Sequence, residues 1–268
     1  MNLKPVAVLH IPHSSTEIPP DIRRSFVLSD RELESELIRM TDSYTDELFD
    51  CGEAAKVVFP VSRLVVDPER FVDDAEEPMS KVGMGVVYTK TSTGGPLRKS
   101  LTGQGRLFDF VQSRLALIQK YYYPHHQQLT DTVSEALSNH KRCLIIDCHS
   151  FPSKPFRYET DLSPRPDICL GTDSFHTPVW LRDLAAELFG NAGFSVKIDI
   201  PFSGTMVPLT YYHTHGAVYS IMIEINRALY MEEKSGRRNA KFEQTKNRVR
   251  AVLLEMVKRG LGTGDDLN

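Results

Sequence analysis

The chain has 268 residues, of which 41% are hydrophobic and 25% charged, and its formal net charge is -3. This is an ordinary globular composition, and the small negative charge excludes the basic surface that nucleic acid or an anionic membrane requires. No apolar run approaches the ~20 residues of a membrane span, and the N-terminus has neither the basic start nor the cleavage site of a signal peptide. We therefore expect a cytoplasmic protein whose partner is a small molecule.

In the first third of the chain, strand and helix patterns alternate. The pattern predicts a strand over 6–11, a helix capped at Ser29 or Asp30, a short helix ending at Gly52, strands over 56–59 and 63–66, and a loop over 67–80. A further strand around Val86 and Val87 leads into the threonine- and glycine-rich segment 89–96, a loop that could cover a site.

The rest of the chain continues the alternation. A long helical pattern runs from 105 to 139, with a kink expected at Pro124. Strands are predicted over 143–146, 168–170, 194–198 and 218–224, helices over 178–188 and 240–258, and a loop over 203–216. Because no internal repeat or linker interrupts this order, we predict one α/β domain over residues 1–268.

Three candidate chemical groups stand at or near the ends of predicted buried strands: His13, His149 and Glu224. The strand before His149 is apolar without alternation, as in strands buried on both faces, and ligands of open α/β sheets bind where such strands end. Imidazoles and carboxylates that meet at a sheet edge suit Zn²⁺. Glu224 lies in the run IMIEIN, where a carboxylate costs several kcal/mol unless a cation or hydrogen bonds hold it.

Several acids compete for the place beside these histidines. Asp42 and Asp46 are four residues apart on a predicted helix, where they could also form a solvated stripe. Glu17 follows His13 at the same spacing, but the neighbouring prolines disfavour a helix there. Asp147, two residues before His149 on the same side of the strand, could orient an imidazole or cap the next turn.

Other polar residues leave more than one interpretation open. Arg63 and Arg70 flank Asp67 and could clamp a substrate carboxylate or stabilise an oxyanion, or could form surface ion pairs with Asp67 or Glu69. Of the pair His125 and His126 at the expected kink, one is predicted to reach the site and the other solvent. His213 and His215 have metal-like spacing within a loop that could also be exposed.

These motifs occur in an order that resembles the N-formylglutamate amidohydrolase family. The matching segments, over roughly residues 5–232, are IPHSS, TDSYTDELFD, VSRLVVDPER, YYYPHH, IIDCHSFPSKP, PDICLGT and IMIEINRALYM. More distantly, IIDCHS and IEINR resemble the zinc carboxypeptidases. The resemblance implies a single three-layer α/β/α domain with a central mixed sheet. It also implies a metal-dependent hydrolase that releases formate and L-glutamate from N-formyl-L-glutamate, or cleaves a related N-acyl amino acid, in histidine degradation.

The resemblance also implies a role for each candidate. Zn²⁺, or another divalent transition metal, would be held by His13, Asp42 and His149, and Glu224 would be the general base. Arg63 would polarise the formyl oxygen or hold a carboxylate. The implied substrate-binding set is Arg63, Arg70, His126 and Gly204, and the carboxylates expected around the ligands are Asp147, Asp46 and Asp67.

Two segments depart from the family. The loop from Lys197 to His213 lacks the arginines of the family's segment, although Gly204 matches, and this leaves the acyl amino acid open. TDSYTD keeps Asp42 and Asp46 but changes the residues between them. The alternatives are a metallo-carboxypeptidase or cell-wall amidase of the same metal type, and a non-catalytic binding protein.

Overall fold

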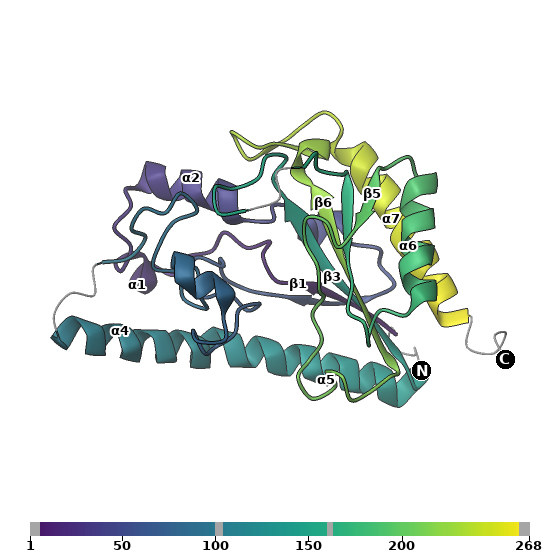
Figure 1. The fold of residues 1–268 in the computed structure, drawn as a ribbon, viewed down its shortest axis with the longest axis horizontal. Coiled ribbons are helices and arrows are strands. Elements are labelled where there is room, and N and C mark those ends of the chain that lie inside the picture. The colour runs from purple at the N-terminus through teal and green to yellow at the C-terminus, as the bar shows by residue number, and fades with distance from the viewer. Residues whose placement is uncertain (1–5, 100–103, 160–162, 263–268) are drawn as a thin grey trace.

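The structure, a computed structural model, describes residues 6–99, 104–159 and 163–262. Its centre is a six-stranded mixed sheet in the order β2-β1-β3-β6-β4-β5, with helices on both faces (Figure 1). The strands are β1 (Ala7–Ile11), β2 (Ala55–Val58), β3 (Cys143–Phe151), β4 (Ile168–Gly171), β5 (Val196–Ile198) and β6 (Val218–Asn226). Two short strands, β7 (Met231–Glu232) and β8 (Arg237–Arg238), pair separately. The predicted α/β fold with a mixed sheet is confirmed.

The helices surround this sheet. The α-helices are α1 (Pro20–Arg23), α2 (Asp30–Met40), α3 (Thr45–Leu48), α4 (Gln104–Leu117), α5 (Tyr123–His140), α6 (Val179–Asn191) and α7 (Phe242–Gly262). Short 3-10 helices are η1 (Pro78–Val82) and η3 (Arg227–Leu229), and η2 (Ile118–Tyr122) is a π-helical turn. Among the described residues, none of these helices has both the length and the apolar character needed to cross a bilayer.

The strand register brings the chemical residues to one edge of the sheet. β1, β3 and β6 run parallel, with His10 beside Asp147 and His149 beside Glu224. β4 is antiparallel to β6, so its first residues lie at the carboxyl end of β6. The polar residues of β1, β3 and β6 therefore lie together toward the carboxyl edge of the sheet, where open α/β sheets bind their ligands.

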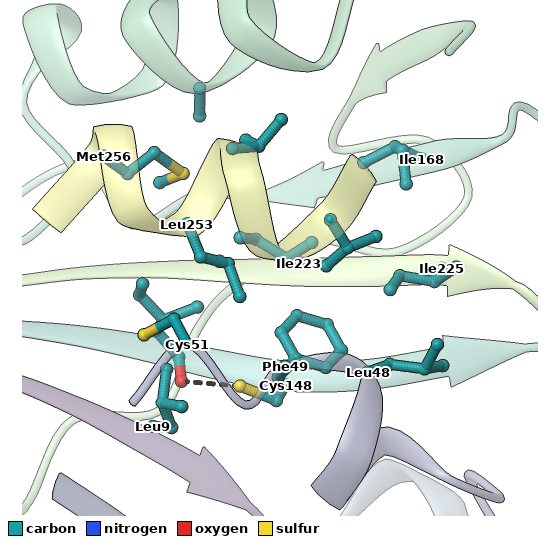
Figure 2. Close-up of a cluster of buried hydrophobic side chains, with 14 of the residues drawn as sticks. Leu9, Leu48, Phe49, Cys51, Cys148, Ile168, Ile223, Ile225, Leu253 and Met256 are labelled. Carbon is teal, nitrogen blue, oxygen red and sulfur yellow. Dashed lines mark hydrogen bonds between the residues drawn. The ribbon is translucent and has the colours of Figure 1, made fainter. Parts of the chain in front are cut away.

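The two faces of the sheet have separate apolar cores. On one face, Leu9 and Cys148 pack with Ile223 and with Leu253 and Met256 of α7 (Figure 2). On the other face, Val8, Ile145 and Val218 pack against Leu129 and Val133 of α5. Since side chains alternate along a strand, His10, Asp147, His149 and Glu224 continue the rows on the α5 face. The site therefore begins where the apolar contact with α5 ends.

Two helices show how local sequence sets their boundaries. α2 begins as predicted at Ser29, whose side chain and the Glu32 carboxylate each accept from the other's backbone N–H. The long helix is irregular as expected beside Pro124, where the π-helical turn η2 separates α4 from α5. A proline inside a helix removes one hydrogen bond and crowds the preceding turn, which a π turn accommodates.

The strands predicted over 63–66 and 86–88 are wrong. Both segments form turns and bends. The helix predicted over 178–188 extends further, to Asn191. The side chains of Leu64, Val65, Val87 and their neighbours are buried in a third apolar core, formed by loops, α2 and η2. A short buried apolar run has the same composition whether or not a neighbouring strand is present, so the pattern alone cannot distinguish the two.

The side chain of Arg98 connects these loops through hydrogen bonds to their backbone. Its guanidinium is buried and donates to the carbonyl oxygens of Tyr88, Leu64 and Val65, each at 2.9 Å, and to Ser25 Oγ at 2.7 Å. Burial lowers the pKa of Arg98 to about 10, so the side chain is charged at neutral pH.

We expect Arg98→Met to lower the free energy of unfolding by about 3 kcal/mol, because it leaves buried carbonyl groups without a donor. Urea unfolding measures the change. Arg182→Met, on partly exposed Arg182 of α6, is the control and should change stability by less than about 0.5 kcal/mol. Equal stability of the two variants would contradict the bracing role of Arg98.

Candidate active site

Three predicted ligands, His13, Asp42 and His149, come together and are buried. Asp42 Oδ2 lies 3.2 Å from His149 Nδ1 and 3.7 Å from His13 Nδ1. The backbone N–H of Asp42 donates to the carbonyl of His13 (2.9 Å), and Arg227 Nη2 donates to Asp42 Oδ1 (2.8 Å). These two hydrogen bonds fix the carboxylate so that Oδ2 faces both imidazoles.

The opposite nitrogens of the two imidazoles face carboxylates. His13 Nε2 is 2.9 Å from Asp67 Oδ1, and His149 Nε2 is 3.1 Å from Asp147 Oδ1. Each ring can therefore donate its Nε2–H outward and keep the Nδ1 lone pair toward Asp42, the arrangement found in carboxylate–histidine–metal sites. Asp67 and Asp147 thus lie where the sequence predicted carboxylates around the ligands.

The residues fit a divalent metal ion. His13 Nδ1 is buried and has no hydrogen-bond partner among the described residues. Tetrahedral bonds of 2.0–2.1 Å place neighbouring donor atoms about 3.4 Å apart, between the 3.2 Å and 3.7 Å separations of Asp42 Oδ2 from the two Nδ1 atoms. Two imidazoles and a carboxylate are a donor set of catalytic zinc sites, which keep a fourth position for water or substrate.

The charges of the site favour a cation. Burial opposes protonation of His149, but Glu69 and Asp147 raise its pKa well above the usual value. Burial also opposes ionisation of Asp42, yet contacts with the two histidines and the charge of Arg227 hold its pKa well below the usual range. The same carboxylates that raise the pKa of these imidazoles favour a bound cation, so protons and a metal ion would compete for the site.

Glu69 is a site residue that the sequence prediction missed. Its Oε1 lies 3.2 Å from His149 Nε2, and its Oε2 lies 3.7 Å from His13 Nδ1. Donor atoms of His13, Glu69 and His149 lie within 4.8 Å of one another, as do those of His10, Glu69 and Asp147. Glu69 therefore competes with Asp42 as the acidic ligand. Glu69 follows Pro68 in a turn. Because it lies on no predicted helix or strand, the sequence pattern did not indicate which way its side chain points.

A buried chain of polar side chains links Asp147 to α5. His10 Nδ1 is 2.7 Å from Asp147 Oδ1, and His10 Nε2 is 2.9 Å from His125 Nε2. Burial lowers the pKa of His125 to about 2, so its neutral ring donates to His10, and His10 donates to Asp147. Asp147 Oδ2 accepts from the backbone N–H of Met206 (2.9 Å). These donors fix the carboxylate that faces His149.

His125 is thus the residue of the histidine pair that enters the polar cluster. His126 Nε2 bonds to the carbonyl of Pro68 (2.8 Å), and its ring packs 4.2 Å from that of Tyr122. It therefore supports the turn that carries Asp67 and Glu69, and it does not project freely into solvent as one of the pair was expected to do.

Glu224 has the environment of a general base. It lies beside His149 in the register of β3 and β6, is 8% exposed, and its Oε2 has no hydrogen-bond partner among the described residues. Burial raises the pKa of Glu224 to about 7, a net value in which the charge of His149 opposes the rise and that of Asp42 adds to it. A carboxylate with such a pKa can accept and return a proton near neutral pH.

Of the predicted substrate-binding residues, Arg63 and Arg70 lie beside Asp67, and Gly204 lies in the 197–213 loop. Arg63 donates through Nη2 to Asp67 Oδ2 (2.8 Å), so the ion pair considered from the sequence is present. Arg70 Nε is 3.7 Å from the same oxygen and is buried without a hydrogen-bond partner among the described residues. Gly204 has a φ of 88°, in the left-handed region, two residues before Met206.

The structure does not bring Asp46, Glu17 or His213 to the site. Asp46 and Glu17 are exposed, and His213 pairs with Asp173 at 2.9 Å. Asp42 and Asp46 do not share a helical face, because Tyr44 between them has a φ of 66° and α3 begins only at Thr45. The placement of Asp46 among the carboxylates around the ligands is therefore corrected.

The comparisons with known proteins agree with this fold. The sequence pattern of the N-formylglutamate amidohydrolase family matches residues 6–231. The solved structure of N-formylglutamate amidohydrolase from Ralstonia eutropha JMP134 is 24% identical, with 96% of this chain and 94% of that chain covered and a TM-score of 0.79. A gene product of Agrobacterium tumefaciens is 18% identical, with 96% and 92% covered and a TM-score of 0.65. No curated protein matches the sequence.

Proposed function

Since the chain belongs to the N-formylglutamate amidohydrolase family, it is a hydrolase that acts on an amide bond, and we propose that it deformylates N-formyl-L-glutamate or cleaves a related N-acyl amino acid. His13, Asp42 and His149 would hold a divalent metal, with zinc as the first candidate. The observation that carries this proposal is the buried Glu224 carboxylate beside His149, whose Nδ1 faces Asp42; Glu224 Oε2 has no hydrogen-bond partner in the part of the chain that the structure describes.

The chain's own residues would perform the proton transfers. A divalent ion bound there supplies Lewis-acid chemistry, which polarises a carbonyl and lowers the pKa of water toward about 7. The oxygen of a water molecule attacks the formyl carbon while Glu224 accepts a proton from it. Glu224 then passes that proton to the amide nitrogen as the C–N bond breaks, leaving formate and L-glutamate. Such general acid–base transfer contributes about 10²–10⁴-fold to the rate.

Arg63 and Arg70 would hold the substrate. Arg63 stands beside the turn that carries Asp67 and Glu69. The buried Nε of Arg70, which has no hydrogen-bond partner within the described ranges, can donate to a carboxylate. We assign the formyl oxygen or one substrate carboxylate to Arg63 and a carboxylate to Arg70. His126 and Gly204 would act on the shape of the pocket through the Pro68 turn and the 197–213 loop.

A hydrolysis screen tests this function. The metal-supplemented chain would be assayed against N-formyl, N-acetyl and N-succinyl amino acids and against small peptides, with release of the acid and of the amine both measured. We expect N-formyl-L-glutamate to have the highest kcat/KM. Turnover of peptides alone would favour the metallo-carboxypeptidase alternative, and no turnover with any metal would leave a binding protein as the better description.

A further inference from the structure

Arg165 is a buried cation with unused donors. Its side chain is 3% exposed, and one nitrogen, Nη2, pairs with Glu159. Nε and Nη1 are buried and have no hydrogen-bond partner among the described residues. A buried donor without a partner is destabilising, because it has lost its hydrogen bonds to water. The guanidinium is therefore arranged for an acceptor that a ligand supplies.

This guanidinium lies on the same face of the sheet as the candidate catalytic residues. Phe151 follows His149 by two residues in β3, so both side chains point to one face and their backbones are about 6.6 Å apart. The Cζ atom of Arg165 is 5.3 Å from the centre of the Phe151 ring. Arg165 precedes β4, whose first residues lie at the carboxyl end of β6, just beyond Glu224.

Phe202 covers the guanidinium from the 197–213 loop. Its ring centre is 5.5 Å from Arg165 Cζ and 5.8 Å from the Phe151 ring. Cys169 Sγ donates to the Phe202 carbonyl (3.2 Å), and Cys169 is the register partner of Glu224. The backbone of Phe202 is thus held near the candidate catalytic residues, and the residue itself is partly exposed, so the guanidinium lies close to the surface of the 197–213 loop.

We propose that Arg165 binds the side-chain carboxylate of an acidic N-acyl amino acid, which makes it a specificity-determining residue of the site. This inference rests on the proposed amide hydrolysis. In N-formylglutamate that carboxylate is five bonds from the formyl carbon, roughly 6 Å at bond lengths near 1.5 Å, similar to the spacing from His149 to Phe151. The 197–213 loop contains no arginine, so Arg165 would supply the positive charge from the segment before β4.

The test compares N-formyl-L-glutamate with N-formyl-L-glutamine, which has the same shape without the charge. For Arg165→Gln we expect kcat/KM for formylglutamate to fall about 100-fold, mainly through KM, because a hydrogen bond to a charged group is lost. The value for formylglutamine should change by less than about 3-fold. Arg165→Lys should lie between, since lysine keeps the charge without the guanidinium geometry. An equal loss for both substrates would overturn the proposal.

Two further variants separate recognition from structure. Glu159→Gln removes the ion-pair partner but leaves Arg165, so the preference for formylglutamate should persist; its loss would show that the pair acts only structurally. Arg182→Gln, on partly exposed Arg182 of α6, is the control and should leave both substrates unaffected. Thermal unfolding of each variant establishes that it is folded.

A binding measurement keeps this proposal independent of turnover. L-glutamate would be titrated calorimetrically into the metal-supplemented full chain and into Arg165→Gln, with L-glutamine as the comparison ligand. We expect the variant to bind L-glutamate at least 10-fold more weakly. Equal binding would refute the role of Arg165. Arg165-dependent binding without any hydrolysis would refute the proposed function alone.

Discussion

Glu224→Gln is expected to lower kcat by about 10³-fold or more while the chain keeps its metal. The glutamine has nearly the same shape as the carboxylate but cannot accept a proton from water. Because Glu224 contributes no donor atom to the His13, Asp42 and His149 cluster in the proposed site, metal affinity should be unaffected. Steady-state kinetics and elemental analysis of the same sample measure both quantities.

The matched control is Glu187→Gln, at an exposed position of α6 on the opposite side of the sheet, which should leave kcat unchanged. If Glu224→Gln turned over at the wild-type rate, the base would have to be another group, and Glu69 would be the next candidate. If it lost both metal and activity, Glu224 would instead be a ligand.

The pH dependence of the reaction follows from the burial of Glu224. Burial raises the pKa of this group to about 7, and only the ionised carboxylate accepts a proton. The rate should therefore rise with pH and level off once Glu224 is ionised, and the positive charge of a bound metal ion would shift this rise below pH 7. The residual activity of Glu224→Gln should lack the same rise. An identical profile in the variant would show that another group titrates.

The sheet and the core of the site were predictable because they depend on continuous apolar strands. The runs before His149 and around Glu224 are buried on both faces, and their polar interruptions mark where the strands reach the functional edge. The boundaries were less accurate: β3 and β6 extend to Phe151 and Asn226, beyond the predicted ends.

The periodicity of the sequence does not reveal the remaining features of the site. Glu69 occupies a turn that Asp67 and the His126 ring hold in place, and the contact between His10 and His125 joins residues 115 positions apart. Asp42 could not be separated from Asp46 because the left-handed conformation of Tyr44, uncommon for a residue other than glycine, has no sequence signal.

His149→Ala is expected to abolish metal binding at micromolar metal and, with it, activity. The imidazole contributes one of three proposed donors, and a tetrahedral site with only two protein ligands binds weakly. Asp67→Asn should be milder, because it removes no proposed donor atom; it weakens the acceptor of His13 Nε2–H, which also pairs with Arg63, and a loss of about 10–100-fold in affinity is typical of such a change. Full metal occupancy in His149→Ala would exclude that histidine as a ligand.

The identity of the acidic ligand follows from a second pair of variants. Asp42 Oδ2 faces the Nδ1 atoms of both histidines, whereas Glu69 faces Nδ1 of His13 and Nε2 of His149, a nitrogen that Asp147 also contacts. A ring that binds metal through Nδ1 can keep its bond to Asp147, so the Asp42 geometry retains more contacts. We therefore expect Asp42→Asn to lose metal and Glu69→Gln to retain it; the reverse result would assign the ligand to Glu69 and turn His149 to bind through Nε2.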